Sequence, residues 1–120
     1  MKEIKTGDRI VRNLSSDPYR SFDAPGLVYE GMTYLPLDET RVPGTGFHVI
    51  RMEPGTVSAA HEHTADEMFY VLEGELIESD GARYRRGDMV LLRAGTQHES
   101  HTPGGCTLLV YVETLERPVE

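Results

Sequence analysis

The sequence predicts an all-β fold, an antiparallel barrel or sandwich, and three observations support this prediction. No apolar stripe at helical spacing persists for three turns anywhere in the chain. Short stretches rich in β-branched and aromatic residues recur instead, and such residues favour strands. The 12 glycines and 7 prolines are spread along the chain, where they mark turns between these stretches. Many short strands joined by closely spaced turns are typical of barrels and sandwiches.

The turn residues also set the expected order of elements. Residues 1–25 are polar, contain two prolines, and are expected to form an arm with a short turn or strand. Gly31 and Gly74 are each expected to end a strand. Asp80-Gly81 tolerates positive φ and predicts a hairpin between the strands on either side. The expected strands cover residues 27–29, 32–37, 47–52, 57–63, 67–72, 75–78, 82–85, 89–92, 98–101 and 107–113.

The length of 120 residues is typical of one domain and is sufficient to bury one ordinary core. We therefore expect a single domain over 1–120, with the arm and leading strands in 1–45 and the barrel core in 46–115. Cys106 is the only cysteine, so the fold is not a disulfide scaffold, and a buried, inert thiol is expected.

The charge balance limits the partners. The chain has 20 acidic and 12 basic residues and a net charge of −8, which argues against nucleic acid and anionic membrane surfaces as partners. No apolar run approaches the ~20 residues needed to cross a bilayer. The N-terminal stretch lacks the apolar segment of a signal peptide. A cytoplasmic location is the expectation that follows.

Four residues form a pattern that is typical of a metal site on strands. His61, His63 and Glu67 lie in the stretch HEHTADE, and His98 lies in GTQHES. Imidazole nitrogens and a carboxylate oxygen are ligands that divalent transition metals prefer. Residues two apart on a strand point to one face, so the first two histidines can converge. A hydrogen-bonded polar cluster without metal, or a general acid/base pair that uses the glutamate, is the alternative.

The strand that starts at Glu67 is apolar on both faces. If Glu67 faces the interior with the histidines, Phe69 and Val71 face inward as well, and Met68 and Tyr70 face outward. A strand that is apolar on both faces is covered on both sides. We therefore expect a second sheet or a partner subunit over the outer face, and we infer a homodimer.

Two further residues are candidates for a pocket that binds a small-molecule ligand or substrate. Phe69 would contribute an apolar wall beside the metal. His48 shares a face with Ile50 and Met52, but the alternating set that starts at Phe47 is an equally plausible inner face. His48 is therefore either a surface or supporting residue or a pocket residue.

The stretch from Gly55 to Gly74 resembles the first sequence motif of the cupin superfamily, Gly-x5-His-x-His-x3-Glu-x6-Gly. The matching residues are Gly55, His61, His63, Glu67 and Gly74. The stretch from Gly87 is similar to the second motif, Gly-x5-Pro-x-Gly-x2-His-x3-Asn, and the matching residues there are Gly87, Gly95 and His98. Arg93 replaces the expected proline and Thr102 the expected asparagine, so no ligand position is affected.

The resemblance implies a cupin jelly-roll barrel, a double-stranded β-helix, with an N-terminal arm and one divalent transition metal inside: iron, manganese, nickel or zinc. It implies that His61, His63, Glu67 and His98 are the ligands. The downstream stretch HTPGGCTLLVYVE is similar to the cupin domain of zinc-binding anti-sigma factors, and this subgroup includes acetylacetone-cleaving dioxygenases. The first 47 residues contain neither His nor Cys, so we expect no zinc site within them.

Three functions are compatible with this pattern. The first is a metal-dependent dioxygenase that acts on a small organic molecule, because three histidines and one glutamate leave two positions open on an octahedral metal. The second is a non-enzymatic module that binds or senses a metal and a small ligand. The third is a sugar isomerase or epimerase, which would need basic pocket residues. The candidates for that role are Arg51, Arg83, Arg85 and Arg93.

Overall fold

The computed structural model describes residues 1–24 and 27–119, and these residues form strands and turns without a helix, as predicted. Pro25, at the end of the expected arm, lies outside the described residues. The strands are β1 Arg20–Ala24, β2 Leu27–Pro36, β3 Gly46–Met52, β4 Thr56–Glu62, β5 Glu67–Glu78, β6 Arg83–Arg85, β7 Met89–Leu92, β8 Gln97–Thr102, β9 Cys106–Val112 and β10 Arg117–Pro118.

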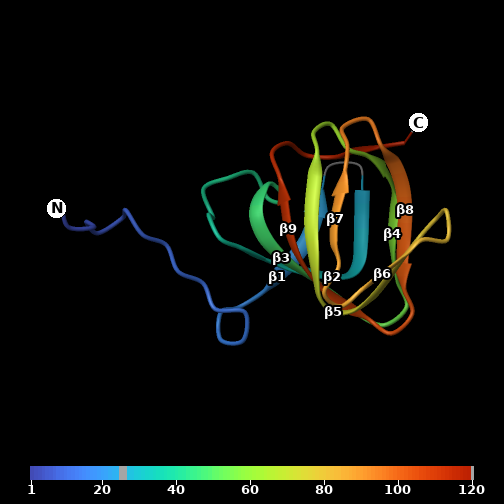
Figure 1. Ribbon diagram of the computed structural model, residues 1–120, viewed down its shortest axis with the longest axis horizontal. Helices are drawn as coiled ribbons and strands as arrows, with labels where there is room; N and C mark the ends of the chain where they lie inside the picture. The colour runs from blue at the N-terminus through green and yellow to red at the C-terminus, as the bar shows by residue number, and fades with distance from the viewer. Residues whose placement is uncertain (25–26, 120) are drawn as a thin grey trace.

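All strand pairs are antiparallel, and the main sheet has the order β1-β2-β3-β9-β5-β8-β4-β10. The long strand β5 joins the two halves of this sheet. Residues 67–74 pair with β9, and residues 67–70 also pair with β7. Residues 75–78 pair instead with β6 and β8. Because one strand takes part in both halves, the sheet curls into the barrel seen in Figure 1.

Two glycines that were expected to end strands lie within them. β2 continues through Gly31, and β5 continues through Gly74, with φ values of +76° and +79°. A Cβ atom added at Gly74 would lie 2.1 Å from the carbonyl oxygen of Gly105, so only glycine allows this close approach. The pairing of β5 with β9 shifts register between Val71 and Glu73. Glycine therefore bends the strand here and does not interrupt it.

The structure decides which face of β3 lines the interior. His48, Ile50 and Met52 are buried, whereas Phe47 and Arg51 are exposed. The core that these inward residues join is formed mainly by β2, β5 and β9. Its members include Tyr34, Phe69, Val71, Leu108 and Val110. The candidate pocket residue His48 thus lies on the inner face.

The start of the N-terminal arm extends away from the barrel (Figure 1), whereas the Leu14 carbonyl accepts a hydrogen bond from Arg51 of β3. The C-terminal segment instead returns to the barrel, where β10 pairs with β4. Within the described ranges, no helix is long and apolar enough to cross a membrane.

Candidate metal centre

The paired strands β4 and β8 bring the histidines together. His61 on β4 lies directly opposite His98 on β8 in the antiparallel register. His63 follows the end of β4, where its N–H donates to the Thr96 carbonyl and its carbonyl accepts from the Gly95 N–H, at 3.0 and 2.8 Å. The turn before β8 therefore fixes the position of His63 relative to His98.

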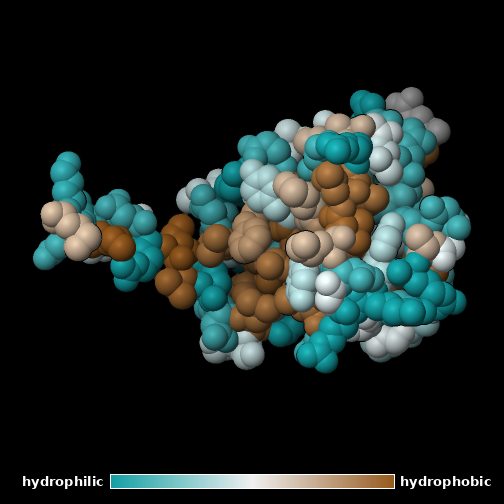
Figure 2. All heavy atoms as spheres, viewed as in Figure 1, coloured by the Kyte–Doolittle hydropathy of each residue, from teal (hydrophilic) through white to brown (hydrophobic). Residues whose placement is uncertain are grey.

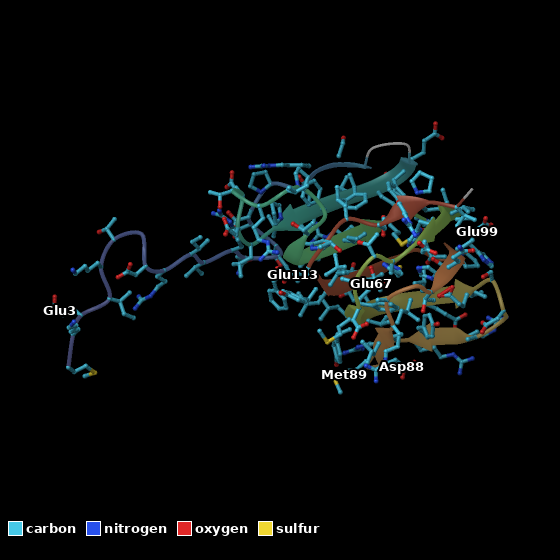
Figure 3. All side chains as sticks on the ribbon, turned by 90° about the horizontal axis from the view of Figure 1, so that it is seen from above. Glu3, Glu67, Asp88, Met89, Glu99 and Glu113 are labelled. Carbon is cyan, nitrogen blue, oxygen red and sulfur yellow. The ribbon has the colours of Figure 1, made fainter. Side chains whose placement is uncertain are left out.

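The Nε2 atoms of the three histidines converge on one point inside the barrel. Their separations are 3.2 Å between His61 and His63, 2.8 Å between His63 and His98, and 2.9 Å between His98 and His61. Glu67, the first residue of β5, places its Oε1 3.4 Å from the Nε2 of His63. Figure 3 shows Glu67 within the barrel. The structure thus brings together all four residues that the sequence singled out.

The hydrogen bonds of two histidines fix which nitrogen faces this point. The Nδ1 of His61 lies 2.7 Å from the Ala59 carbonyl oxygen, and the Nδ1 of His98 lies 2.8 Å from both carboxylate oxygens of Glu78. These oxygens accept hydrogen bonds, so each Nδ1 carries a proton, and in the neutral form of the ring Nε2 presents a lone pair to this point. Two lone pairs 2.9 Å apart repel one another unless a cation lies between them.

The geometry fits a transition metal. Metal–nitrogen bonds of about 2.0–2.1 Å that meet at about 90–110° place neighbouring nitrogens roughly 2.8–3.4 Å apart. The three Nε2 separations, 2.8–3.2 Å, agree with that spacing. Glu78 orients His98 from behind, as carboxylates do for histidines that bind metals. The donor set therefore matches a divalent metal better than it matches a network of neutral hydrogen bonds.

Burial and neighbouring charges shift the protonation of the cluster. Burial, with the added repulsion of Glu116 and Glu78, raises the pKa of Glu67 to about 8. Burial, together with His61 and His98, lowers the pKa of His63 to about 3. Burial thus favours the neutral form of His61 and His63, and a divalent cation would stabilise the ionised form of Glu67.

Two carboxylates beside the histidines were not anticipated from the sequence. Glu78 is buried behind His98, although it has the opposite parity to Glu67 along β5. The register shift between Val71 and Glu73 turns it inward, so alternation from Glu67 places it on the wrong face. Glu116 lies beyond β9, and its Oε2 is 3.2 Å from the Nε2 of His61. No motif or periodicity marks this residue.

Both candidate pocket residues line the cavity beside the cluster. Phe69 and His48 contribute to its wall, and the remaining free space is about 50 Å³. His48 donates from Nδ1 to the Gly46 carbonyl at 3.0 Å, and burial lowers its pKa. The other wall residues are mostly apolar and include Met32, Ile50, Leu76, Leu108 and Val110. The cavity is therefore small, and its wall is mostly apolar.

The arginines that a phosphosugar site would need lie elsewhere. Arg83 and Arg85 pair with Glu75 on the outside of the barrel. Arg51 stacks over Tyr19, with the guanidinium carbon 3.9 Å from the ring centroid. These side chains do not line the cavity, nor does that of Arg93.

Comparison with known families identifies the chain. The model of the family described as the ChrR Cupin-like domain matches residues 14–116, so the chain belongs to this family. The jelly-roll fold and the relationship to cupins predicted from the two motifs are thereby confirmed. No match was found among curated proteins.

Solved structures with this fold have diverse functions. An acetylacetone dioxygenase from Acinetobacter johnsonii superposes with a TM-score of 0.76 at 14% identity, over 93% of this chain and 78% of that one. The Rhodobacter sphaeroides complex of SigE with the anti-sigma factor ChrR superposes with a TM-score of 0.66 at 18% identity, over 85% of this chain. This chain spans about half of that structure's chain, 52%. The polyketide cyclase RemF from Streptomyces resistomycificus superposes with a TM-score of 0.61 at 20% identity, over 100% of this chain and 86% of that one. At these identities the likeness establishes the fold alone.

Proposed function

We propose that this protein is a metal-dependent enzyme of the dioxygenase type that acts on a small organic molecule. The observation that carries the proposal is the convergence of three imidazole Nε2 atoms beside a buried carboxylate, in an apolar cavity. The proposed ligands are His61, His63, Glu67 and His98. The proposed cofactor is one divalent ion of iron, manganese, nickel or zinc, since these metals accept nitrogen and oxygen ligands.

The residues around the cluster suit such chemistry. A metal bound there would act as a Lewis acid and orient an oxygen-donor substrate and dioxygen. Ala59 and Glu78 hold two of the imidazoles in the tautomer that binds metal. Phe69 and its apolar neighbours exclude water from the same space. The free volume of about 50 Å³ favours a substrate of few atoms, because typical ligand pockets measure about 300–1,000 Å³.

Oxygen consumption tests this proposal. The protein, freed of metal and reloaded with Fe(II) without oxygen, is mixed with small β-dicarbonyls or catechols, and oxygen uptake is recorded. Uptake with one class of substrate, and its loss in the His98→Ala variant, is the expected result. A fully loaded protein that consumes no oxygen with any substrate of the panel would refute the enzymatic proposal.

A binding or sensing module is the second candidate. Its support is the family itself, which takes its description from the anti-sigma factor ChrR, together with the little free space around the cluster. Such a module would show a rise in melting temperature with metal and a small ligand but no turnover. The third candidate, a sugar isomerase or epimerase, is disfavoured because the four candidate arginines lie outside the cavity.

A homodimer is part of the same proposal. An apolar surface lies over β3, β5, β7 and β9 (Figure 2), and its exposed members include Phe47, Met68, Tyr70, Met89 and Leu91. Two acidic copies repel one another through charged surfaces, whereas an uncharged face can pair with itself about a two-fold axis. We expect sedimentation to report a dimer that Met68→Glu converts to monomer. A wild-type monomer at high micromolar concentration would overturn this expectation.

A further inference from the structure

The segment after β9 returns to the mouth of the barrel and is held there. In β10, Arg117 pairs with Glu62 and Pro118 pairs with His61 across the β4 edge. The Thr64 hydroxyl donates to the carbonyl of Leu115 at 2.7 Å. The guanidinium of Arg117 also forms an ion pair with the Glu62 carboxylate. Residue 116 is therefore fixed beside the strand that carries the first histidine.

The carboxylate of Glu116 faces the histidine cluster. Its Oε2 lies 3.2 Å from the Nε2 of His61, which is the nitrogen that presents a lone pair. One oxygen or nitrogen from each of Glu116, Glu67 and His63 lies within 4.8 Å of the others. The side chain of Glu116 is only 13% exposed. The Glu116 carboxylate is thus as close to His61 as the Glu67 carboxylate is to His63.

The other oxygen of Glu116 is already occupied. Oε1 accepts a hydrogen bond from the hydroxyl of Tyr29, a buried residue of β2. This bond orients the carboxylate, whose other oxygen, Oε2, lies beside His61. Two elements far apart in the sequence, β2 and the C-terminal segment, therefore hold one carboxylate oxygen beside the Nε2 of His61.

We infer that Glu116 is a fifth protein ligand of the metal, bound through one oxygen and positioned by Tyr29. The inference rests on the proposed metal site and extends it. Four protein ligands leave two positions open on an octahedral ion, and Glu116 occupies one of them. A substrate that binds through two oxygens must therefore displace this carboxylate, whereas a single small ligand need not.

The test uses the full-length protein loaded with Co(II), whose visible absorption reports its coordination. Glu116→Gln is expected to change the Co(II) spectrum and to weaken Co(II) binding by roughly tenfold or more, since loss of even an outer contact costs about 10–100-fold. Glu113→Gln is the matched control, because Glu113 lies in the same segment but pairs with Arg41 at the surface. Its spectrum and affinity should equal those of the wild type.

The Tyr29→Phe variant tests whether Glu116 is a metal ligand or only supports the fold. It leaves the carboxylate in place but frees its second oxygen, so the spectrum should change while the affinity falls by only a few-fold. If Glu116→Gln does not fold, the spectrum of Tyr29→Phe decides the matter. Spectra and affinities of Glu116→Gln and Tyr29→Phe that equal those of Glu113→Gln would overturn the inference.

Titration with a two-oxygen chelator tests displacement. Acetohydroxamate should bind the Co(II) form of Glu116→Gln about tenfold more tightly than the wild type, because no carboxylate competes. Equal affinity would overturn the idea that a chelating ligand displaces Glu116. These readouts require no turnover, so an absence of oxygen uptake leaves them interpretable. A wild-type protein that does not bind Co(II) would instead refute the metal site itself.

Discussion

The inner and outer surfaces of the curled sheet differ in how far their apolar side chains are buried. On β5, Phe69 and Val71 face inward and are buried, with 5% and 0% of their surface exposed. Their neighbours Met68 and Tyr70 face outward and are 47% and 38% exposed, although they are equally apolar. The inner surface is buried within one chain, and the imidazoles of the proposed metal site interrupt its apolar wall. The outer surface leaves apolar side chains exposed, and we propose that a second copy of the chain covers them.

Removing an inner ligand should have the largest effect. His61→Ala is expected to lower metal occupancy after dialysis by an order of magnitude or more, because a nitrogen donor is lost. Ser100→Ala should retain the metal, although Ser100 is buried on the same strand as His98. Metal analysis of the dialysed proteins measures both. Full occupancy in a variant that lacks both His61 and His98 would contradict the assignment of the ligands.

Loss of the carboxylate behind His98 should have the next largest effect. Glu78→Gln weakens the acceptor that fixes the His98 tautomer, so metal affinity should fall by about 10–100-fold. Glu75→Gln is the control, because Glu75 lies on the same strand but pairs with Arg83 and Arg85 outside the barrel. Competition with a chromophoric chelator gives both affinities. Equal values for the two variants would show that Glu78 does not support the site.

Metal affinity should also depend on pH through Glu67. The pKa of Glu67 in the metal-free protein is raised to about 8, so the group is protonated at neutral pH and the metal must displace a proton. Affinity should therefore rise about tenfold per pH unit up to about pH 8 and then level off. The pKa of His63 is lowered to about 3, so this imidazole should compete for protons only in strong acid. Glu67→Gln should remove the slope between pH 6 and 8, and an unchanged slope would exclude Glu67 as its origin.

The raised pKa of Glu67 also determines how the stability of the metal-free protein changes with pH. Between about pH 4.5 and 8 the folded state keeps a proton on Glu67 that the unfolded state releases. The contribution of this group to stability is therefore present at low pH and is lost as the pH rises to about 8. Urea unfolding of the metal-free protein and of Glu67→Gln across this range measures it. A wild-type contribution that grows with pH would contradict the raised pKa.

Truncation of side chains on β5 should have the smallest effects, and the buried and exposed faces should respond differently. Val71→Ala leaves a cavity in the core and should lower the free energy of unfolding by about 2 kcal/mol. Met68→Ala should change it by less than about 0.5 kcal/mol in the monomer, because exposed side chains contribute little. Urea unfolding at low protein concentration measures both. A large loss for Met68→Ala under those conditions would indicate that the outer face packs within a single chain.

Much of the site could be anticipated because its signal is local. The spacing of His61 and His63 and the short turn before His98 are properties of neighbouring residues, and pairing of β4 with β8 is enough to bring them together. Alternation along β5 likewise predicted that Phe69 faces inward. The assignment of these residues as metal ligands remains a proposal, but their proximity needed no information from distant parts of the chain.

The features that could not be predicted depend on the path of the backbone, which local sequence patterns do not encode. Gly31 and Gly74 were expected to end strands, yet both permit a strand to bend and continue. The bend after Val71 reverses the alternation and turns Glu78 inward, which periodicity from Glu67 cannot reveal. The inner face of β3, and with it the burial of His48, was also undecidable from two equally apolar sets.

The sequence by itself determined the all-β class, the antiparallel barrel or sandwich, and the four clustered residues. Side-chain periodicity and ligand spacing depend on only a few neighbouring positions in the chain. Only the tertiary structure decided that Glu78 contacts His98 and that Tyr29 contacts Glu116, whose carboxylate lies beside His61. Those contacts join segments up to 87 positions apart in the chain. The path of the backbone through the bends and the returning C-terminal segment determines them, and no local pattern specifies that path.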